Sequence, residues 1–83
     1  MPVHYKEDLS ILDELLAELT RAPQTETVRL SYEHIKSAHR YLFGAAWPEF
    51  RASLKEARGS LSPIGDSALK DRLKSLLARL DHA

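Results

Sequence analysis

The sequence predicts an all-α protein, a small irregular four-helix bundle with helices at about residues 5–21, 28–44, 48–58 and 66–80. Apolar residues recur at intervals of three and four along most of the chain, as they do on one face of an α-helix. Proline and glycine interrupt this pattern only at short connectors, which suits neighbouring antiparallel helices. Residues 28–32 alternate like a strand, but no second such run exists to pair with them.

The first expected helix, 5–21, carries two adjacent rows of apolar residues. Such a broad stripe can contact two neighbouring helices at once, as a bundle helix must. Acidic residues cover most of its remaining surface, and Pro23 marks its end. The rows are Leu9, Leu12, Leu16 and Leu19, with Ile11 and Leu15 beside them.

The second expected helix, 28–44, repeats apolar residues every seven positions, with small residues between them that let a neighbour approach closely. A polar connector, 24–27, precedes it. We expect the helix to stop near Gly44, because glycine adopts a left-handed cap at little cost. The apolar positions are Val28, Ile35 and Leu42, and the small residues are Ser31, Ala38 and Ala45.

The remaining two helices are marked by residues that favour helix ends. Pro48 suits the first turn of the third helix, and Gly59 is expected to cap it. Residues 60–65 form a loop, and Asp66 is a good N-cap for the fourth helix. The residues expected to face the core are Phe50, Leu54 and Ala57, then Leu69, Leu73, Leu76 and Leu80, flanked by Leu77.

Length and composition limit the classes of protein to be considered. The 83 residues make one domain, 1–83, with little stability in reserve. The absence of cysteine excludes disulfides and thiolate metal sites and suits a reducing compartment. The chain turns acidic at once, unlike a signal peptide, and no apolar run approaches the roughly 18 residues of a membrane-spanning helix. We therefore expect a soluble cytoplasmic protein that does not enter membranes.

Charge is balanced overall but uneven along the chain. Twelve basic and twelve acidic residues give no net charge, which disfavours general attraction to nucleic acid. Residues 1–20 carry one lysine and five acidic side chains, net −4, so residues 21–83 carry net +4. We expect the acidic first helix to pack across the basic remainder and neutralise the asymmetry internally.

Five of the six aromatic residues fall between positions 32 and 50, together with two of the four histidines. The helical projection places His39 in the apolar arc with Phe43, which predicts a partly buried packing residue. His34 shares a second face with Leu30 and Tyr41, and that face packs either on the bundle or on an external partner. The two histidines are too far apart round the helix to share a metal ion, so no metal or cofactor site is predicted.

Cations and a tryptophan follow the aromatic cluster. Arg51, Lys55 and Arg58 line one side of the third helix. Together with Arg40 they could contact an acidic partner, although a solvated face is the ordinary alternative. Trp47 either plugs the end of the bundle or anchors an interaction, since tryptophan beside arginine is typical of binding hot spots.

Two short runs resemble motifs of known four-helix families. Residues 38–44 (AHRYLFG) are similar to the phosphorylatable helix of histidine phosphotransfer domains, which implies phosphotransfer at His39. That family typically has lysine and then glycine where this chain has Leu42 and Phe43, and the lysine helps to neutralise the phosphoryl group. Residues 65–69 (GDSAL) resemble the phosphopantetheine attachment motif of carrier proteins. Only sixteen residues follow Ser67, however, and we interpret this run as a helix start.

These observations predict a non-enzymatic helical interaction module, such as a regulator, inhibitor, immunity-type protein or small subunit, that docks onto another protein. Glycine-rich phosphate loops and distinctive paired carboxylates are both lacking from the sequence. The alternatives are a phosphotransfer-like or phosphate-sensing protein using His39 and a nucleic-acid-binding protein using the third helix. The second apolar face would equally serve a homodimer. The predicted contact residues are Leu30, His34, Arg40, Tyr41, Trp47, Arg51, Lys55 and Arg58.

Overall fold

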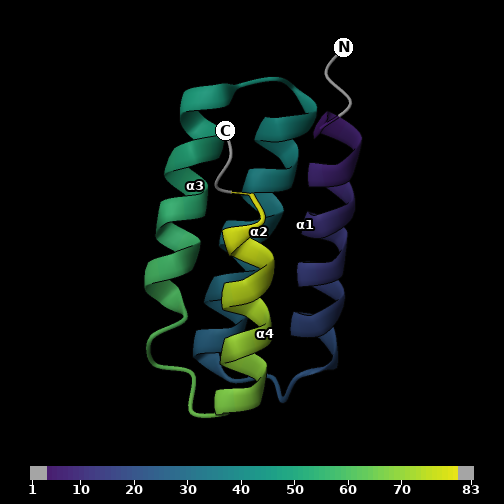
Figure 1. Cartoon of the computed structure of the whole chain (residues 1–83). Coiled ribbons are helices and arrows are strands. Elements are labelled where there is room, and N and C mark those ends of the chain that lie inside the picture. The colour runs from purple at the N-terminus through teal and green to yellow at the C-terminus, as the bar shows by residue number, and fades with distance from the viewer. Residues whose placement is uncertain (1–3, 81–83) are drawn as a thin grey trace.

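The chain forms four α-helices and no strand within residues 4–80, the part that the computed structural model describes (Figure 1). The predicted all-α four-helix bundle is therefore confirmed. The helices are α1 (His4–Arg21), α2 (Glu26–Phe43), α3 (Trp47–Ser60) and α4 (Ser67–Ala78).

The helices run alternately up and down, and each packs against its neighbours in the chain (Figure 1). α4 closes the bundle by contacting α1 as well as α3, on the side away from α2. Within the described residues, no Cα atom of α1 lies within 8 Å of one in α3, and none of α2 within 8 Å of one in α4, so these pairs lie diagonally across the bundle. The molecule is a rod of 38 by 18 by 18 Å.

The core is aliphatic apart from one aromatic ring. Phe50 is completely buried, as its spacing predicted. In α4, Leu77 is buried more deeply than expected, while Leu76 is half-buried: it packs against the core and also lines a groove beside α1. Leu77 lies four residues after Leu73, so it continues the same row into the core. The buried apolar residues are Ile11, Leu12, Leu15, Leu19, Val28, Ile35, Ala38, Leu42, Phe50, Leu54, Ala57, Leu61, Ile64, Leu69, Leu73, Leu77 and Leu80.

Polar side chains begin two of the helices. The hydroxyl oxygen of Thr25 accepts a hydrogen bond from the N–H of Val28 at 3.2 Å, so α2 starts two residues before the expected position. Asp66 caps α4 as predicted, accepting from the N–H of Leu69 at 3.1 Å. Thr25 was assigned to a connector because the apolar repeat begins only at Val28.

The contact between α2 and α3 includes a buried pair of hydroxyls. Ser31 is fully buried, and its Oγ lies 2.8 Å from Oγ of Ser60. The Ser60 hydroxyl donates to the carbonyl of Ala57 at 2.7 Å, so Ser31 is the donor to Ser60. This anchoring carries α3 past Arg58, the expected end, and Gly59, the expected cap, to Ser60, with Leu61 buried beyond it.

Candidate docking surface

The connection from α2 to α3 is a tight corner whose left-handed position holds an alanine. Ala45 has φ of 56°, whereas Gly44 has φ of −88°. The N–H of Ala46 donates to the carbonyl of Tyr41 at 2.8 Å and that of Ala45 to Leu42 at 3.0 Å, the pair of bonds in a Schellman motif. The left-handed residue was expected at Gly44, and this prediction is wrong by one position. Gly44 is the C-cap of α2, and the left-handed residue is Ala45, which follows it.

Three large aromatic side chains surround this corner at one end of the bundle, and we call Tyr41, Phe43 and Trp47 the corner aromatics. Phe43 is 70% exposed, and Tyr41 and Trp47 are 36% exposed each. The rings of Trp47 and buried Phe50 meet edge to face, with centroids 6.3 Å apart and planes at 81°. Trp47 thus rests on the core with one side and presents the other to solvent.

The position of Phe43 corrects the expected apolar arc of α2. Phe43 follows buried Leu42, and one residue turns the helix by about 100°, which carries its ring away from the core. The ring borders a shallow hollow of about 300 Å³ together with Lys36, His39 and Arg40. A hollow with one aromatic wall and a cationic rim can hold an apolar side chain and pair with a carboxylate.

The two histidines of α2 have different surroundings. His39 Nε2 lies 3.3 Å from Oδ1 of Asp13 on α1, and the His39 side chain is 33% exposed. It is therefore partly buried, as its helical position predicted. His34 is also half-buried, but it lies on another face of α2.

The eight predicted contact residues do not form one patch, because those of α2 and the corner are separated from those on the side of α3 next to α4. The bond from Ser31 to Ser60 shows which side of α3 faces α2. Arg58 precedes Ser60 by two residues, about 200° round the helix, and lines a groove beside α4 instead. Arg51 and Lys55 share the Arg58 side by helical spacing. Leu30, His34, Arg40 and Tyr41 belong to α2, Trp47 to the corner, and Arg51, Lys55 and Arg58 to the side of α3 next to α4.

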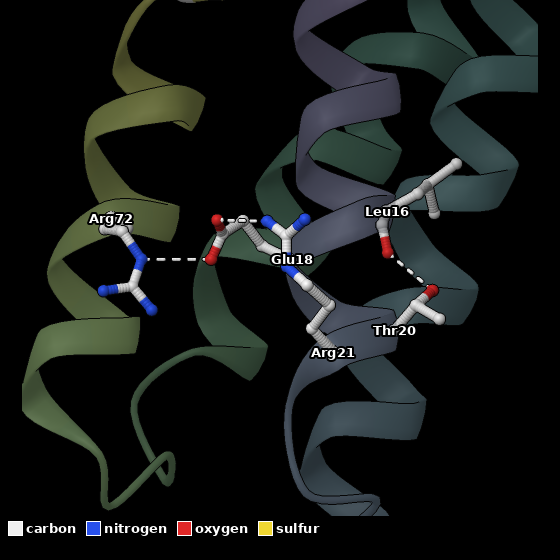
Figure 2. Close-up of polar contacts among 5 residues, drawn as sticks. All are labelled: Leu16, Glu18, Thr20, Arg21 and Arg72. Carbon is white, nitrogen blue, oxygen red and sulfur yellow. Dashed lines mark hydrogen bonds and ion pairs between the residues drawn. The ribbon is translucent and has the colours of Figure 1, made fainter.

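A second polar cluster joins α1 to α4 (Figure 2). Glu18 accepts hydrogen bonds from Arg72 Nε at 3.0 Å and from Arg21 Nη2 at 2.7 Å. These guanidinium groups, Arg72 foremost, hold the pKa of the Glu18 carboxyl below its usual value, although partial burial opposes them. The cluster borders a groove of about 610 Å³ that Ala17 and Leu76 also line. Sequence reasoning placed Glu18 on the helix exterior and missed Arg72, because spacing along one helix gives no signal for a partner 54 residues away.

The described part of the chain contains neither a cluster of metal ligands nor a membrane-spanning helix. No group of three or more histidine, cysteine, aspartate or glutamate side chains gathers there in a way that could hold a metal ion. None of the helices in residues 4–80 combines the length and the apolar character that crossing a membrane requires.

Comparison of the chain with protein-family models, with curated proteins and with solved structures finds no match.

Proposed function

We propose that the protein is a non-enzymatic helical module that docks onto another protein through the corner aromatics and the adjoining outer surface of α2. The observation that carries this proposal is the exposure of Tyr41, Phe43 and Trp47 in a bundle whose core contains the aromatic ring of Phe50 and otherwise aliphatic side chains. Each aromatic side chain can bury about 150–250 Å² against a partner. Exposed rings at one end of a small protein are typical of an interaction site.

The charges around Phe43 indicate the chemistry of the partner. Lys36 and Arg40 lie on the rim of the hollow that Phe43 borders, and both side chains are exposed. Aromatic and arginine side chains together dominate the binding energy of many interfaces. We therefore expect the partner to present an apolar side chain next to one or more carboxylates.

The test compares substitutions in the hollow with a matched substitution elsewhere on α2. Phe43→Ser and Arg40→Ala should each reduce capture of the partner from native lysate at least tenfold, because a hot-spot side chain contributes about 2 kcal/mol or more. Circular dichroism and the melting temperature should stay nearly unchanged, since both side chains are exposed. The captured protein is identified by mass spectrometry.

The matched control is Arg29→Ala. Arg29 is an exposed cation eleven residues before Arg40, which puts it on the same outer face of α2 at the other end of the bundle. Capture should survive this substitution. If Arg29→Ala and Arg40→Ala weaken capture equally, binding depends on general charge and the proposed site is wrong. Tyr41→Ala and Arg51→Ala then define how far the site extends round the corner.

The phosphotransfer alternative at His39 has weaker support. The carboxylate of Asp13 lies 3.3 Å from Nε2 of His39, where it would repel an incoming phosphoryl group. The position three residues after the histidine holds Leu42, which is completely buried. Incubation with a phosphodonor and mass spectrometry without acid treatment should therefore show no added phosphoryl group.

A further inference from the structure

The hollow beside Phe43, which we now call the first hollow, is one of two on the same side of α2. The second hollow has a volume of about 480 Å³ and lies towards the start of α2. Its lining residues are Thr20, Gln24, Arg29, Tyr32 and Glu33. The two hollows share a single stripe of α2, whose members follow one another at intervals of three and four. They are Arg29, Tyr32, Lys36, His39 and Phe43.

α1 lies beside this stripe and sets what separates the hollows. α1 and α2 are antiparallel neighbours (Figure 1), and the contact of Asp13 with His39 fixes their register. Counting from that contact places Thr20 level with Tyr32, and these two residues do line one hollow. The same count places Leu16 of α1 between the two hollows. We call the seam of α1 and α2 that contains both hollows the α1–α2 groove.

The α1–α2 groove has apolar surface along its length. Tyr32 in the second hollow and Leu16 between the hollows pack against the core, and each is only half-buried. Phe43 at the other end is exposed. A partner that covers the whole groove would therefore bury more apolar surface than one that fills the first hollow alone.

The charges along the outer edge of the groove are concentrated at one end. Exposed Lys36 and Arg40 line the first hollow, while Asp13 on the α1 side contacts His39. At the second hollow, Arg29 and Glu33 lie one turn apart, so their charges offset one another. Carboxylates of a partner are therefore attracted to the first hollow and not to the second.

A helix fits this groove better than an extended segment. α1 and α2 use their backbone groups in their own hydrogen bonds, so an extended peptide would bury N–H and C=O groups without partners. A helix satisfies its own backbone groups. The α2 residues of the two hollows are centred near positions 31 and 39, roughly 12 Å apart along the axis. A helix lying alongside presents the same face again after two turns, or roughly 10.5 Å.

We propose that the α1–α2 groove binds an amphipathic α-helix of the partner, with apolar side chains two turns apart in the two hollows and carboxylates beside Lys36 and Arg40. This inference rests on the proposed function and extends its site, because the first hollow becomes one half of a longer groove. Arg29→Ala should still leave capture intact, since it removes a charge that Glu33 offsets and leaves Tyr32 in place.

Selection of peptides tests the spacing without the natural partner. A phage-displayed library of randomised peptides of roughly 18 residues, or about five helical turns, is selected on the unmodified protein. Peptides that also bind Phe43→Ser are discarded. The retained peptides should share two large apolar residues about seven or eight positions apart, with aspartate or glutamate near one of them. Circular dichroism should show that they gain helix on binding.

A substitution in the second hollow tests whether the helix reaches it. Thr20 is exposed there, so Thr20→Trp should fill the hollow and weaken binding of a retained peptide at least tenfold by fluorescence anisotropy. Ala52→Trp, at an exposed position of α3, is the matched control and should leave the affinity unchanged. Circular dichroism checks that both variants are folded. Amide chemical shifts of the unmodified protein should change at both hollows when the peptide binds.

The outcomes separate the helical occupant from the docking site on which it rests. Retained peptides that bind Thr20→Trp undiminished, or that lack the two-turn spacing, would overturn the helical occupant alone. So would a library without any peptide that requires Phe43, if Phe43→Ser still weakens capture from lysate. Loss of both effects would overturn the docking site as well.

Two other occupants of the groove would also be recognised. A dimer of the protein alone that Phe43→Ser dissociates in sedimentation velocity would assign the groove to a second copy of this chain. Binding of a fluorescent single-stranded DNA that Arg40→Ala abolishes would assign it to nucleic acid. Either result would overturn the proposal.

Discussion

Ala45 holds the α2–α3 corner in a backbone conformation that alanine rarely adopts. Its φ of 56° lies in the left-handed region, where a Cβ atom costs roughly 1–2 kcal/mol. Gly44, immediately before it, has φ of −88°, and a Cβ there would lie 3.6 Å from the nearest atom, the carbonyl oxygen of Arg40. The glycine and the alanine thus occupy each other's preferred positions.

Two single substitutions at this corner should both stabilise the protein. Ala45→Gly removes the left-handed strain, and after the loss of about 0.4–1 kcal/mol for the more flexible unfolded chain a gain of roughly 0.5–1 kcal/mol remains. Gly44→Ala should add about 0.4–1 kcal/mol by restricting the unfolded chain. Urea denaturation followed by circular dichroism measures both. A loss of stability in Gly44→Ala would mean that Gly44, not Ala45, takes the left-handed conformation.

Phe43 shows at the scale of one residue what helical spacing leaves undetermined. Helical spacing places Leu42 and Phe43 in one apolar arc of α2. It does not show how much of that arc the neighbouring helices cover. Because α1 and α3 cover the side of α2 that bears Leu42, Phe43 falls outside their contact. Helical spacing therefore predicted Phe43 on the apolar side of α2, although it is the most exposed of the large hydrophobic side chains in the described part of the chain.

Among the elements, α2 and α3 are joined by a hydrogen bond that the apolar pattern concealed. Ser31 was predicted as a small seam residue, and it is buried as expected for close approach of two helices. Its Oγ additionally lies 2.8 Å from Oγ of Ser60. A buried hydroxyl with a partner both stabilises and aligns the two helices, because a shift along their axes would leave it unpaired.

Ser31→Ala should lower the free energy of unfolding by about 1 kcal/mol, the typical net contribution of a hydrogen bond. Ser37→Ala on the same helix is the matched control, because it makes the same change in helix propensity at a half-buried position outside the buried core. Denaturant titration of both variants gives the difference. Equal stabilities would show that the hydroxyl pair contributes nothing beyond packing.

The helices themselves were predictable, and their ends were less so. Apolar periodicity predicted all four elements, and Asp66 and Pro48 predicted two of their starts, because these local signals act within one or two turns. Thr25 and Ser60 escaped detection for different reasons. Thr25 lies three residues before Val28, where the apolar repeat begins, so the repeat does not mark it, while Ser60 extends α3 through a partner 29 residues away in the chain.

At the scale of the whole molecule, the arrangement of the helices decides which charges meet. The sequence shows that the first helix is acidic and the third is basic, but not that they lie diagonally apart. In that arrangement the predicted contact residues of α2 are separated from Arg51, Lys55 and Arg58, which lie on the side of α3 next to α4. It also brings Glu18 to Arg72, so that one carboxylate links the first helix to the last (Figure 2).

Acid should weaken the bundle through this carboxylate. The arginines lower the pKa of Glu18 in the folded protein, so the unfolded chain takes up the proton first as the pH falls. The stabilisation is complete above about pH 4.5, the ordinary value of this group, and is lost as the pH falls through the folded pKa. Both arginine side chains are more than half exposed, so solvent and salt screen the interaction.

Glu18→Gln should therefore lower the free energy of unfolding by about 0.5–1 kcal/mol at neutral pH. As the pH falls through the folded pKa of Glu18, the difference from the unmodified protein should shrink, because Glu18 then becomes protonated in both states. Urea denaturation at several pH values and dilute protein measures the difference. Glu56→Gln, which removes one exposed carboxylate from α3, should leave the pH dependence unchanged. A loss in Glu18→Gln that is the same at every pH would show that Glu18 stabilises the α1–α4 contact by packing rather than by charge.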